Sequence, residues 1–379
     1  MTFTEPVEEE TLPRYHPENY YPVSIGQVFH ERYKVLAKLG FGGSSTTWLA
    51  QDVTRWRFQK NRFVTLKILT RDVTDNHSTS SELALSTQIA KANPTHEGLR
   101  YIRTVLDSFE AQSQFGVHLC LVYVPMRETL STFARRLQNG CLPGNLLKPL
   151  LKFLLTALDY LHTQCHIIHT DLKPDNILLG IEDEEIINEL IKEEQRHPSP
   201  AKVYDDRRIY AHRNFGDLRG PPGRPKIADF GLAVRSSFDG TFNHPIQPDL
   251  LQAPEVILRA GWSYSADIWN LGVMIWDLLE GRSLFQAFDP DTDSYAPDIH
   301  LNEMISFLGP PPKQLLVRGE STAQFFTPEE TVTSSTCFFI AFLMRPRNGY
   351  TEIVRFLIGG GKGNDDYSAE YYWERIILL

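Results

Sequence analysis

The segment HTDLKPDN, residues 169–176, constrains this chain of 379 residues more than any other stretch. It sets Asp171 five residues before Asn176, with Lys173 between them, directly after a leucine-rich run with helical spacing. A carboxylate, an ammonium group and an amide so placed can accept a proton, neutralise negative charge and bind a cation. An ordinary turn before a strand is the alternative when the segment is considered alone. Other motifs along the chain have to decide between the two interpretations.

Composition narrows the class of protein. With 42% apolar residues, the chain can build a sizeable core as one two-lobed unit or as two ordinary domains. The net charge of -9 argues against direct binding to nucleic acid and favours basic partners. The N-terminus is acidic and no run of eighteen apolar residues occurs, so we expect neither a secretory signal nor a membrane span. The cysteines, which we expect to be reduced thiols because they lack paired spacing, are Cys120, Cys141, Cys165 and Cys337.

The N-terminal third has the pattern of an antiparallel sheet. Residues 1–32 predict an extended arm, and residues 33–70 hold three runs rich in β-branched and aromatic residues, separated by glycine or polar clusters. These runs predict an antiparallel meander. A helix near residues 81–90 and two strands at 102–109 and 118–124 are expected to follow.

Two long helices are predicted in the rest of the chain. Leucines recur at helical spacing behind Pro149 and predict a core helix that leads into the segment 169–176. Residues 265–280 are apolar on nearly all sides and stop at Gly281, which predicts a second helix buried in the middle of a domain.

An insertion at about residues 180–226 separates these parts. Its first half, IEDEEIINELIKEEQ, places seven acids around four apolar residues and predicts a short acidic amphipathic helix. Its second half is basic and rich in proline and glycine. A solvated surface insertion is favoured over a docking element, because charged runs are mostly solvated faces.

The run LGFGGSSTT suggests a site for phosphate. It lies between two predicted strands, where glycines let backbone N–H groups approach phosphate oxygens closely. A Gly-Gly-Ser turn in a hairpin is the alternative interpretation. The candidate nucleotide-binding residues of this run are Leu39, Gly40, Phe41, Gly42, Gly43, Ser44, Ser45, Thr46 and Thr47.

Further charged residues complete what phosphoryl transfer requires, namely a held triphosphate, neutralised charge and an aimed hydroxyl. Lys67 lies on the next long strand and would pair with the α- and β-phosphates, with Glu82 of the following helix holding its ammonium group. Asp229 and Asn176 are the candidate magnesium ligands. Asp171 would accept the proton of a hydroxyl, and Lys173 would neutralise charge on the γ-phosphoryl group.

These groups occur in a characteristic order among the expected strands and helices. In that order the chain resembles the eukaryotic protein kinases from about residue 33 to residue 319. The segments that carry the resemblance are the run 39–47, Lys67, Glu82, Asp171, Asn176, Asp229-Phe230-Gly231 and Ala253-Pro254-Glu255.

Four details resemble the SR-protein kinase family, especially its fungal members. Thr170 precedes Asp171 where most kinases have Arg, and the phosphate run is followed by Trp48. The lead Glu18-Asn19-Tyr20-Tyr21-Pro22-Val23 and the insertion before Asp229 also match that family.

The resemblance implies a bilobal α+β kinase fold with ATP in the cleft. The N-lobe, residues 33–124, would be a small antiparallel sheet with one main helix, and the mostly helical C-lobe would span residues 125–326. Tyr123 would guard the back of the adenine pocket, and backbone groups of Val124 and Met126 would bind the adenine edge. It also implies phosphorylation of serines in Arg-Ser repeats of splicing factors by a monomer found in cytoplasm and nucleus, which agrees with an acidic enzyme binding a basic peptide.

The substitution at position 170 bears on regulation. In kinases with Arg before the catalytic Asp, that Arg pairs with a phosphorylated activation loop. Thr170 cannot form this ion pair. We therefore expect activity without phosphorylation of the loop.

Several positions depart from the family pattern. Thr47 and Thr65 replace the small apolar residues that cover the adenine, and Ser86 replaces a larger residue of the helix that carries Glu82. Residues 327–379 do not match the family's last helices, as expected of either a divergent tail or a truncated or misassembled gene model. Glu255 should pair with an arginine from those helices, for which the candidates are Arg345, Arg347 and Arg355.

Two hypotheses follow. The first is an active ATP-dependent serine/threonine kinase that uses Mg²⁺, favoured because all the phosphate-handling and catalytic residues are present. The second is a kinase-fold scaffold or binding protein with feeble catalysis, caused by the altered adenine site and the incomplete C-lobe.

Overall fold

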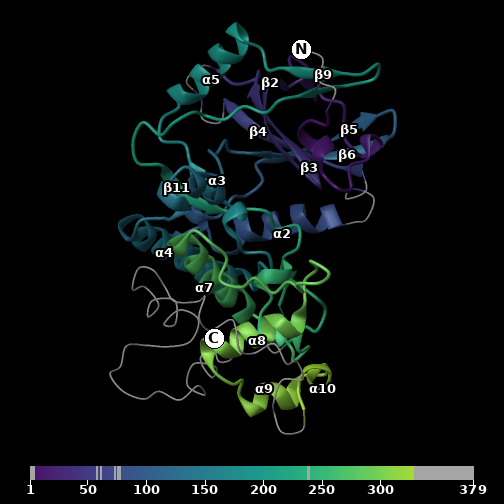
Figure 1. Ribbon diagram of the computed structural model, residues 1–379. Helices are drawn as coiled ribbons and strands as arrows, with labels where there is room; N and C mark the ends of the chain where they lie inside the picture. Colours follow the sequence, from purple (N-terminus) through teal and green to yellow (C-terminus); the bar gives the residue numbers. More distant parts are fainter. Residues whose placement is uncertain are drawn as a thin grey trace. The chain divides into compact units, whose positions relative to one another are not determined.

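The computed structural model describes residues 5–56, 59, 62–71, 74, 78–236 and 240–327 (Figure 1). The chain divides into two compact units: Met1–Thr129 with Ile177–Gly231, and Leu130–Asn176 with Leu232–Leu379. The first unit contains a six-stranded sheet, and the second is mostly helical. The predicted α+β class with two lobes is confirmed.

The sheet of the first unit has the strand order β1-β2-β3-β4-β6-β5, with every neighbouring pair antiparallel. Alternate residues such as Tyr33, Trp48 and Leu66 point into one apolar cluster, as the period of two along each strand requires. The predicted meander is therefore confirmed. The strands are β1 Val28–Phe29, β2 Tyr33–Gly42, β3 Ser45–Asp52, β4 Phe63–Leu69, β5 Asp107–Ser113 and β6 Gly116–Tyr123.

The segment between β4 and β5 contains the main helix of this unit, α2 Ser78–Ala92, followed by the short turn η3 Glu97–Tyr101. The strand predicted over residues 102–109 is wrong in its first half, since β5 begins only at Asp107. The reason is a competing partner: the backbone N–H of Arg103 bonds to the carbonyl of Ile227, so this stretch runs beside β11 before it joins β6.

The insertion folds onto the first unit. It holds β8 Ile177–Gly180, α5 Glu185–Arg196, β9 Ala201–Val203, β10 Arg208–Tyr210 and β11 Gly223–Ile227. The predicted acidic amphipathic helix is confirmed as α5. However, only its outer face is solvated, because Ile187 and Leu190 pack against Ala37 of β2 and Leu49 of β3. The favoured interpretation as a plainly solvated insertion is therefore wrong for the apolar face.

The N-terminal arm is not uniformly extended. It forms the short turns η1 Glu8–Thr11 and η2 Pro17–Asn19 and contributes β1 to the sheet.

The second unit is organised around α7 Ser265–Glu280, which begins and ends where the sequence predicts. Gly281 closes this helix with a φ of 66°, a left-handed conformation that favours glycine. The predicted start of the other long helix at Pro149 is wrong, because α4 spans Gly144–Asp159 with Pro149 inside it. The carbonyl of Pro143 accepts the N–H groups of Leu146 and Leu147 and so starts the helix earlier.

Shorter elements complete the second unit. A π-helical turn, Tyr160–Cys165, follows α4. Strand β7, directly before the segment 169–176, pairs with β12, which follows the Asp229-Phe230-Gly231 motif. The remaining elements are α3 Leu130–Arg135, η4 Gln138–Gly140, β7 Ile167–Ile168, η6 Pro174–Asn176, β12 Val234–Arg235, η7 Asp249–Leu251, α6 Pro254–Ile257, α8 Pro297–Leu308, α9 Lys313–Arg318 and α10 Thr322–Phe325.

The helical run Gln138–Cys165 is long and apolar enough to cross a membrane by length and composition alone. Core helices pass the same test, and α4 buries Leu147, Leu150, Leu154 and Leu158. In the described part of the chain, Cys120, Cys141 and Cys165 lie outside any disulfide bond, in agreement with the expected reduced thiols. The described residues end at Thr327, so most of the predicted segment 327–379 lies outside them. This part of the chain includes Cys337 and the candidate partners of Glu255, namely Arg345, Arg347 and Arg355.

Candidate active site

The glycine-rich run forms the turn between β2 and β3. Gly42 pairs with Ser45, which leaves Gly43 and Ser44 as a two-residue loop. The favoured two-residue hairpin turns need a positive φ, yet neither loop residue is among the described residues that have one. A Cβ atom added to Gly42 or Gly43 would meet nothing within 4 Å. The glycines therefore leave open space through which a phosphate could approach the backbone, and the phosphate contact stays a prediction.

Lys67 lies between two carboxylates in the first unit. Its Nζ is 3.2 Å from each carboxylate oxygen of Glu82 on α2 and 3.0 Å from Oδ1 of Asp229. Burial lowers the pKa of Lys67, but the charges of Glu82 and Asp229 outweigh it and raise the pKa above its ordinary value. The ammonium group is therefore charged and held in place, as the predicted phosphate contact requires.

Tyr123, which was expected at the back of the adenine pocket, contacts Glu82 and packs against Arg103, a residue without an expected role. The Tyr123 hydroxyl donates a hydrogen bond of 2.9 Å to Glu82 Oε1, and the Arg103 guanidinium lies 4.3 Å from the centre of the Tyr123 ring. Burial and the nearby Glu82 carboxylate raise the pKa of the Tyr123 hydroxyl, which keeps it a donor. In the sequence, Arg103 stands out only as a charged residue among mostly apolar neighbours. Tyr123 therefore helps to orient Glu82.

In the second unit, Asp171, Lys173 and Asn176 form one cluster. The Lys173 ammonium lies 2.9 and 2.8 Å from the carboxylate oxygens of Asp171. Asn176 donates from Nδ2 to the Asp171 carbonyl and to its Oδ2, both at 2.8 Å. Asp171 is 8% exposed, and these bonds hold its largely buried carboxylate in place. The geometry suits a carboxylate that accepts a proton.

The backbone before Asp171 is strained and held in place. Thr170 has a φ of 65°, which is unusual for a β-branched residue. Asp267 of α7 accepts the N–H groups of His169 and Thr170, both at 2.8 Å, and the Thr170 hydroxyl donates to the Leu232 carbonyl at 2.8 Å. These bonds stabilise a conformation that the isolated chain would avoid.

Asp267 is another functional residue that the sequence analysis missed. It is fully buried and also accepts a hydrogen bond of 2.8 Å from His162 Nε2. Burial raises the pKa of Asp267, but the hydrogen bonds from His162 and the backbone of His169 outweigh it and lower the pKa. The sequence offered one indication of this role, an acidic residue in the first turn of a mostly apolar helix.

The predicted magnesium ligands belong to different units. Both described side-chain contacts of Asn176 use Nδ2, so Oδ1 is the atom available to a cation. The Asp229 side chain is 46% exposed, and this residue has a φ of 66°. Oxygen donors of this kind fit a hard divalent cation. The assignment of both residues stays a prediction.

The other departures from the family pattern have structural counterparts. The Ser86 side chain accepts the backbone N–H of Val105 at 2.7 Å, so a hydrogen bond takes the place of a bulky side chain in holding α2. The hydroxyl of Thr65 is buried without a hydrogen-bond partner among the described residues. Val124 is 38% exposed and Met126 is buried, and their backbone contacts with adenine stay a prediction.

Comparison with known proteins agrees with this geometry. Residues 33–324 match the protein kinase domain family. A serine/threonine protein kinase of Aspergillus fumigatus is 37% identical over 324 residues, which cover 84% of this chain and 76% of that protein. The serine/threonine-protein kinase SRPK of Physarum polycephalum is 30% identical over 340 residues, covering 84% and 76%.

A third relative, SRSF protein kinase 3 of Mus musculus, is 36% identical over 176 residues, which cover 46% of this chain and 30% of that protein. The ordered motifs, the two units and these matches agree with one another. The chain belongs to the protein kinase family and, within it, to the SR-protein kinases, which makes it an ATP-dependent serine/threonine protein kinase.

Proposed function

We propose that this kinase transfers the γ-phosphoryl group of ATP to serine hydroxyls in Arg-Ser-rich protein segments, with Asp171 as the proton acceptor. The observation that carries the proposal is the cluster of Asp171, Lys173 and Asn176 on a backbone that Asp267 holds in place. Such a preorganised cluster has no evident structural purpose that a simpler turn would not serve.

Each residue of the cluster has a distinct role. Asp171 orients the serine hydroxyl and takes its proton as the bond to phosphorus forms. Lys173 is already paired with Asp171 and supplies positive charge for the phosphoryl group in transfer. Asn176 fixes the Asp171 carboxylate through Nδ2.

The first unit supplies the nucleotide contacts of the proposal. Backbone N–H groups of the run 39–47 bind the phosphates, and Lys67, oriented by Glu82, pairs with the α- and β-phosphates. Backbone groups of Val124 and Met126 bind the adenine edge. Asp229 and Asn176 would each offer an oxygen to magnesium, which would supply positive charge for the β- and γ-phosphates.

The substrate class rests on charge and on the relatives. The chain has a net charge of -9, which favours a peptide rich in arginine. Two of the relatives carry the names SRPK and SRSF protein kinase 3. We propose further that the protein acts as a monomer without direct contact to nucleic acid or membrane. We also propose that it resides in cytoplasm and nucleus, and fluorescence microscopy of the tagged chain tests this location.

The decisive test is transfer of labelled phosphate from ATP to an Arg-Ser repeat peptide. Asp171→Asn should reduce kcat by about 10²–10⁴-fold, the usual contribution of a general base. Asp175→Asn is the matched control, because this substitution makes the same charge change at an exposed residue of the same turn. The Asp175→Asn variant should leave kcat unchanged.

Three outcomes would contradict the proposal in whole or in part. Equal activity of the Asp171→Asn variant and the wild type would remove Asp171 from the reaction. A folded wild-type protein that binds ATP but transfers no phosphate to any serine peptide would favour the scaffold hypothesis. Transfer to basic peptides without serine-arginine repeats would overturn only the substrate class.

A further inference from the structure

Tyr20 of the N-terminal arm contacts the turn of the glycine-rich run. Its side chain is buried, with 6% exposure, and its hydroxyl lies 3.1 Å from the carbonyl oxygen of Gly42 and 3.3 Å from that of Gly43. A phenolic hydroxyl has a single proton to donate, so the two carbonyls share one donor. The arm thus reaches over more than twenty residues of sequence to the tip of the β2–β3 hairpin.

This contact fixes the direction of the neighbouring N–H groups. In a planar trans peptide the C=O and the N–H point to opposite sides. Carbonyls of Gly42 and Gly43 that face the Tyr20 hydroxyl therefore turn the N–H groups of Gly43 and Ser44 away from it. Those two N–H groups are the donors that a phosphate would use.

The loop needs such a restraint. Glycine loses more conformational freedom on ordering than any other residue, so a Gly-Gly turn binds phosphate weakly unless it is ordered beforehand. The space around Gly42 and Gly43 is open, since an added Cβ would meet no atom within 4 Å. Tyr20 supplies a restraint on the carbonyl side and leaves this space free.

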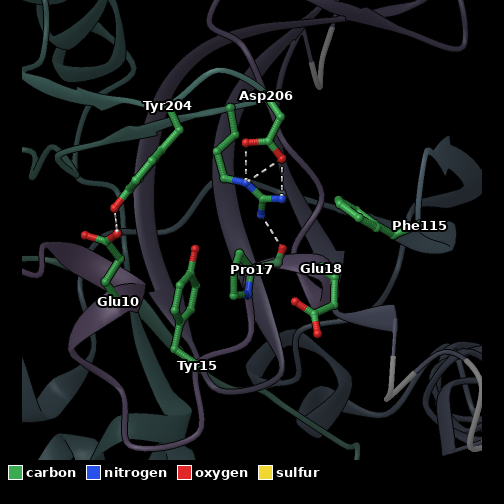
Figure 2. Close-up of a pocket in the computed structure, with 8 residues that line it drawn as sticks. Glu10, Tyr15, Pro17, Glu18, Phe115, Tyr204 and Asp206 are labelled. Carbon is green, nitrogen blue, oxygen red and sulfur yellow. Dashed lines mark hydrogen bonds and ion pairs between the residues drawn. The ribbon is translucent and has the colours of Figure 1, made fainter.

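The arm is itself anchored by the insertion. A pocket of about 400 Å³ lies between the arm, the β9–β10 loop and the turn between β5 and β6 (Figure 2). In its wall the Arg207 guanidinium donates to the carbonyl of Pro17, bonds to Asp206 at 2.8 Å and lies 5.6 Å from the centre of the Phe115 ring. Pro17 lies three residues before Tyr20, so Arg207 holds the arm close to the contact.

Two further interactions support the same arrangement. The rings of Tyr15 and Tyr20 pack with their centres 5.2 Å apart. Lys38 of β2, whose side chain is fully buried, pairs with Glu9 of η1 and lies 3.6 Å from Glu8. The strand that leads into the glycine-rich run is thus bound to the same arm.

We propose that Tyr20 is a positioning residue for the phosphates of ATP. Its hydroxyl orders the backbone at Gly42 and Gly43, and Arg207 of the insertion holds the arm that carries Tyr20. This role rests on the proposed function of the run 39–47 as the phosphate loop. It also gives the arm and the insertion a function in nucleotide binding.

The test compares ligands with and without phosphates on the full chain. Tyr20→Phe removes only the hydroxyl, so calorimetry should show ATP binding weakened by about fivefold, the equivalent of one net hydrogen bond. Adenosine, which lacks phosphates, should bind as it does to the wild type. In the transfer assay the KM for ATP should rise by a similar factor, with kcat little changed.

Tyr21→Phe is the matched control, because this neighbouring hydroxyl bonds to Gln27 Nε2 instead of the loop. It should leave both affinities unchanged. Arg207→Met should weaken ATP binding in the same direction as Tyr20→Phe, again without an effect on adenosine.

The outcomes distinguish the role of Tyr20, the anchoring by Arg207 and the binding of ATP itself. Unchanged ATP affinity of Tyr20→Phe, or equal weakening of ATP and adenosine, would overturn the positioning role while the proposed function stands. Unchanged ATP affinity of Arg207→Met alone would overturn the anchoring step. A folded wild type that binds no ATP would overturn the proposed function itself.

Discussion

Thr65 shows how a single residue can carry a structural cost. It lies on β4 between Leu49 of β3 and Tyr123 of β6, and it is 2% exposed. Its Oγ1 has no hydrogen-bond partner among the described residues. A buried hydroxyl without a partner costs about 1–3 kcal/mol, since it has lost water and gained nothing in return.

We expect Thr65→Val to raise the free energy of unfolding by about 1–2 kcal/mol, because valine keeps the β-branched shape and removes the hydroxyl. Urea denaturation measures this. Thr70→Val is the opposite control. Thr70 is equally buried, but its hydroxyl donates to the Ser44 carbonyl at 3.1 Å, so removal of this hydroxyl should lower the free energy of unfolding. If both variants are destabilised alike, the Thr65 hydroxyl has a partner in solution.

Glu255 is a buried carboxylate that lacks a full set of partners. Ser265 donates to Oε1 at 3.0 Å, while Oε2 has no hydrogen-bond partner in the described ranges. Burial raises the pKa of Glu255, although Ser265 and the charge of Arg318 oppose the shift. A raised pKa means that folding favours the protonated form, so stability falls as the pH rises above the ordinary value of 4.5.

We therefore expect Glu255→Gln to increase stability at pH 7 and to flatten the decline of stability between about pH 4 and 7. Gln keeps the acceptor for Ser265 and carries no charge. Thermal denaturation over this pH range measures the effect. A loss of stability at pH 7 would instead show that Glu255 pairs with a cation beyond the described residues.

At the scale of elements, α5 is part of the core of the first unit. Ile187 and Leu190 pack on Ala37 and Leu49, so the helix covers β2 and β3. The helix also carries exposed acids on its outer face, such as Glu193. Amphipathic packing of this kind makes the insertion a structural element of the sheet.

Leu190→Ala should destabilise the first unit by about 2–5 kcal/mol and speed amide exchange in β2 and β3, because it removes buried contacts and leaves a cavity. Hydrogen–deuterium exchange with mass spectrometry gives the local readout. Glu193→Ala, an exposed position on the same helix, should leave the exchange unchanged. Identical amide exchange in both variants would show that α5 is a solvated surface helix that does not stabilise the sheet.

At the scale of the whole molecule, the main question is how activity is controlled. Thr170 donates its hydroxyl to the Leu232 carbonyl, one residue after the Asp229-Phe230-Gly231 motif. This neutral bond joins the segment before Asp171 to the segment after Gly231 without a phosphate. Control by a phosphorylated loop needs an Arg at this place, and Thr170 cannot supply its charge.

Phosphatase-treated protein should therefore retain most of its activity on an Arg-Ser peptide, with mass spectrometry confirming the absence of phosphate. Thr170→Val should lower kcat, because it removes the bond to Leu232 and keeps the side-chain shape. Complete loss of activity on dephosphorylation would contradict the prediction.

How far the sequence predicts the structure varies between elements. α7 was predicted at both ends, because its apolar pattern and its terminal glycine are local signals. The starts of α4 and β5 were not, since Pro143 and Ile227 provide backbone partners that no local pattern reveals. The same holds at the site: the spacing of Asp171, Lys173 and Asn176 was sufficient to pick out the cluster, whereas Asp267, which holds its backbone, lies almost a hundred residues away.

The family, the order of the chemical groups and the alternation that builds the sheet can be read from residue type and short spacing. The distant groups that restrain the site emerge only from the packing of the fold. Tyr20 meets the Gly42-Gly43 turn, Arg207 meets Pro17, and Asp267 meets Thr170 because packing brings these segments together. Hydrogen bonds across such separations follow from the whole fold, and no local period or propensity encodes them.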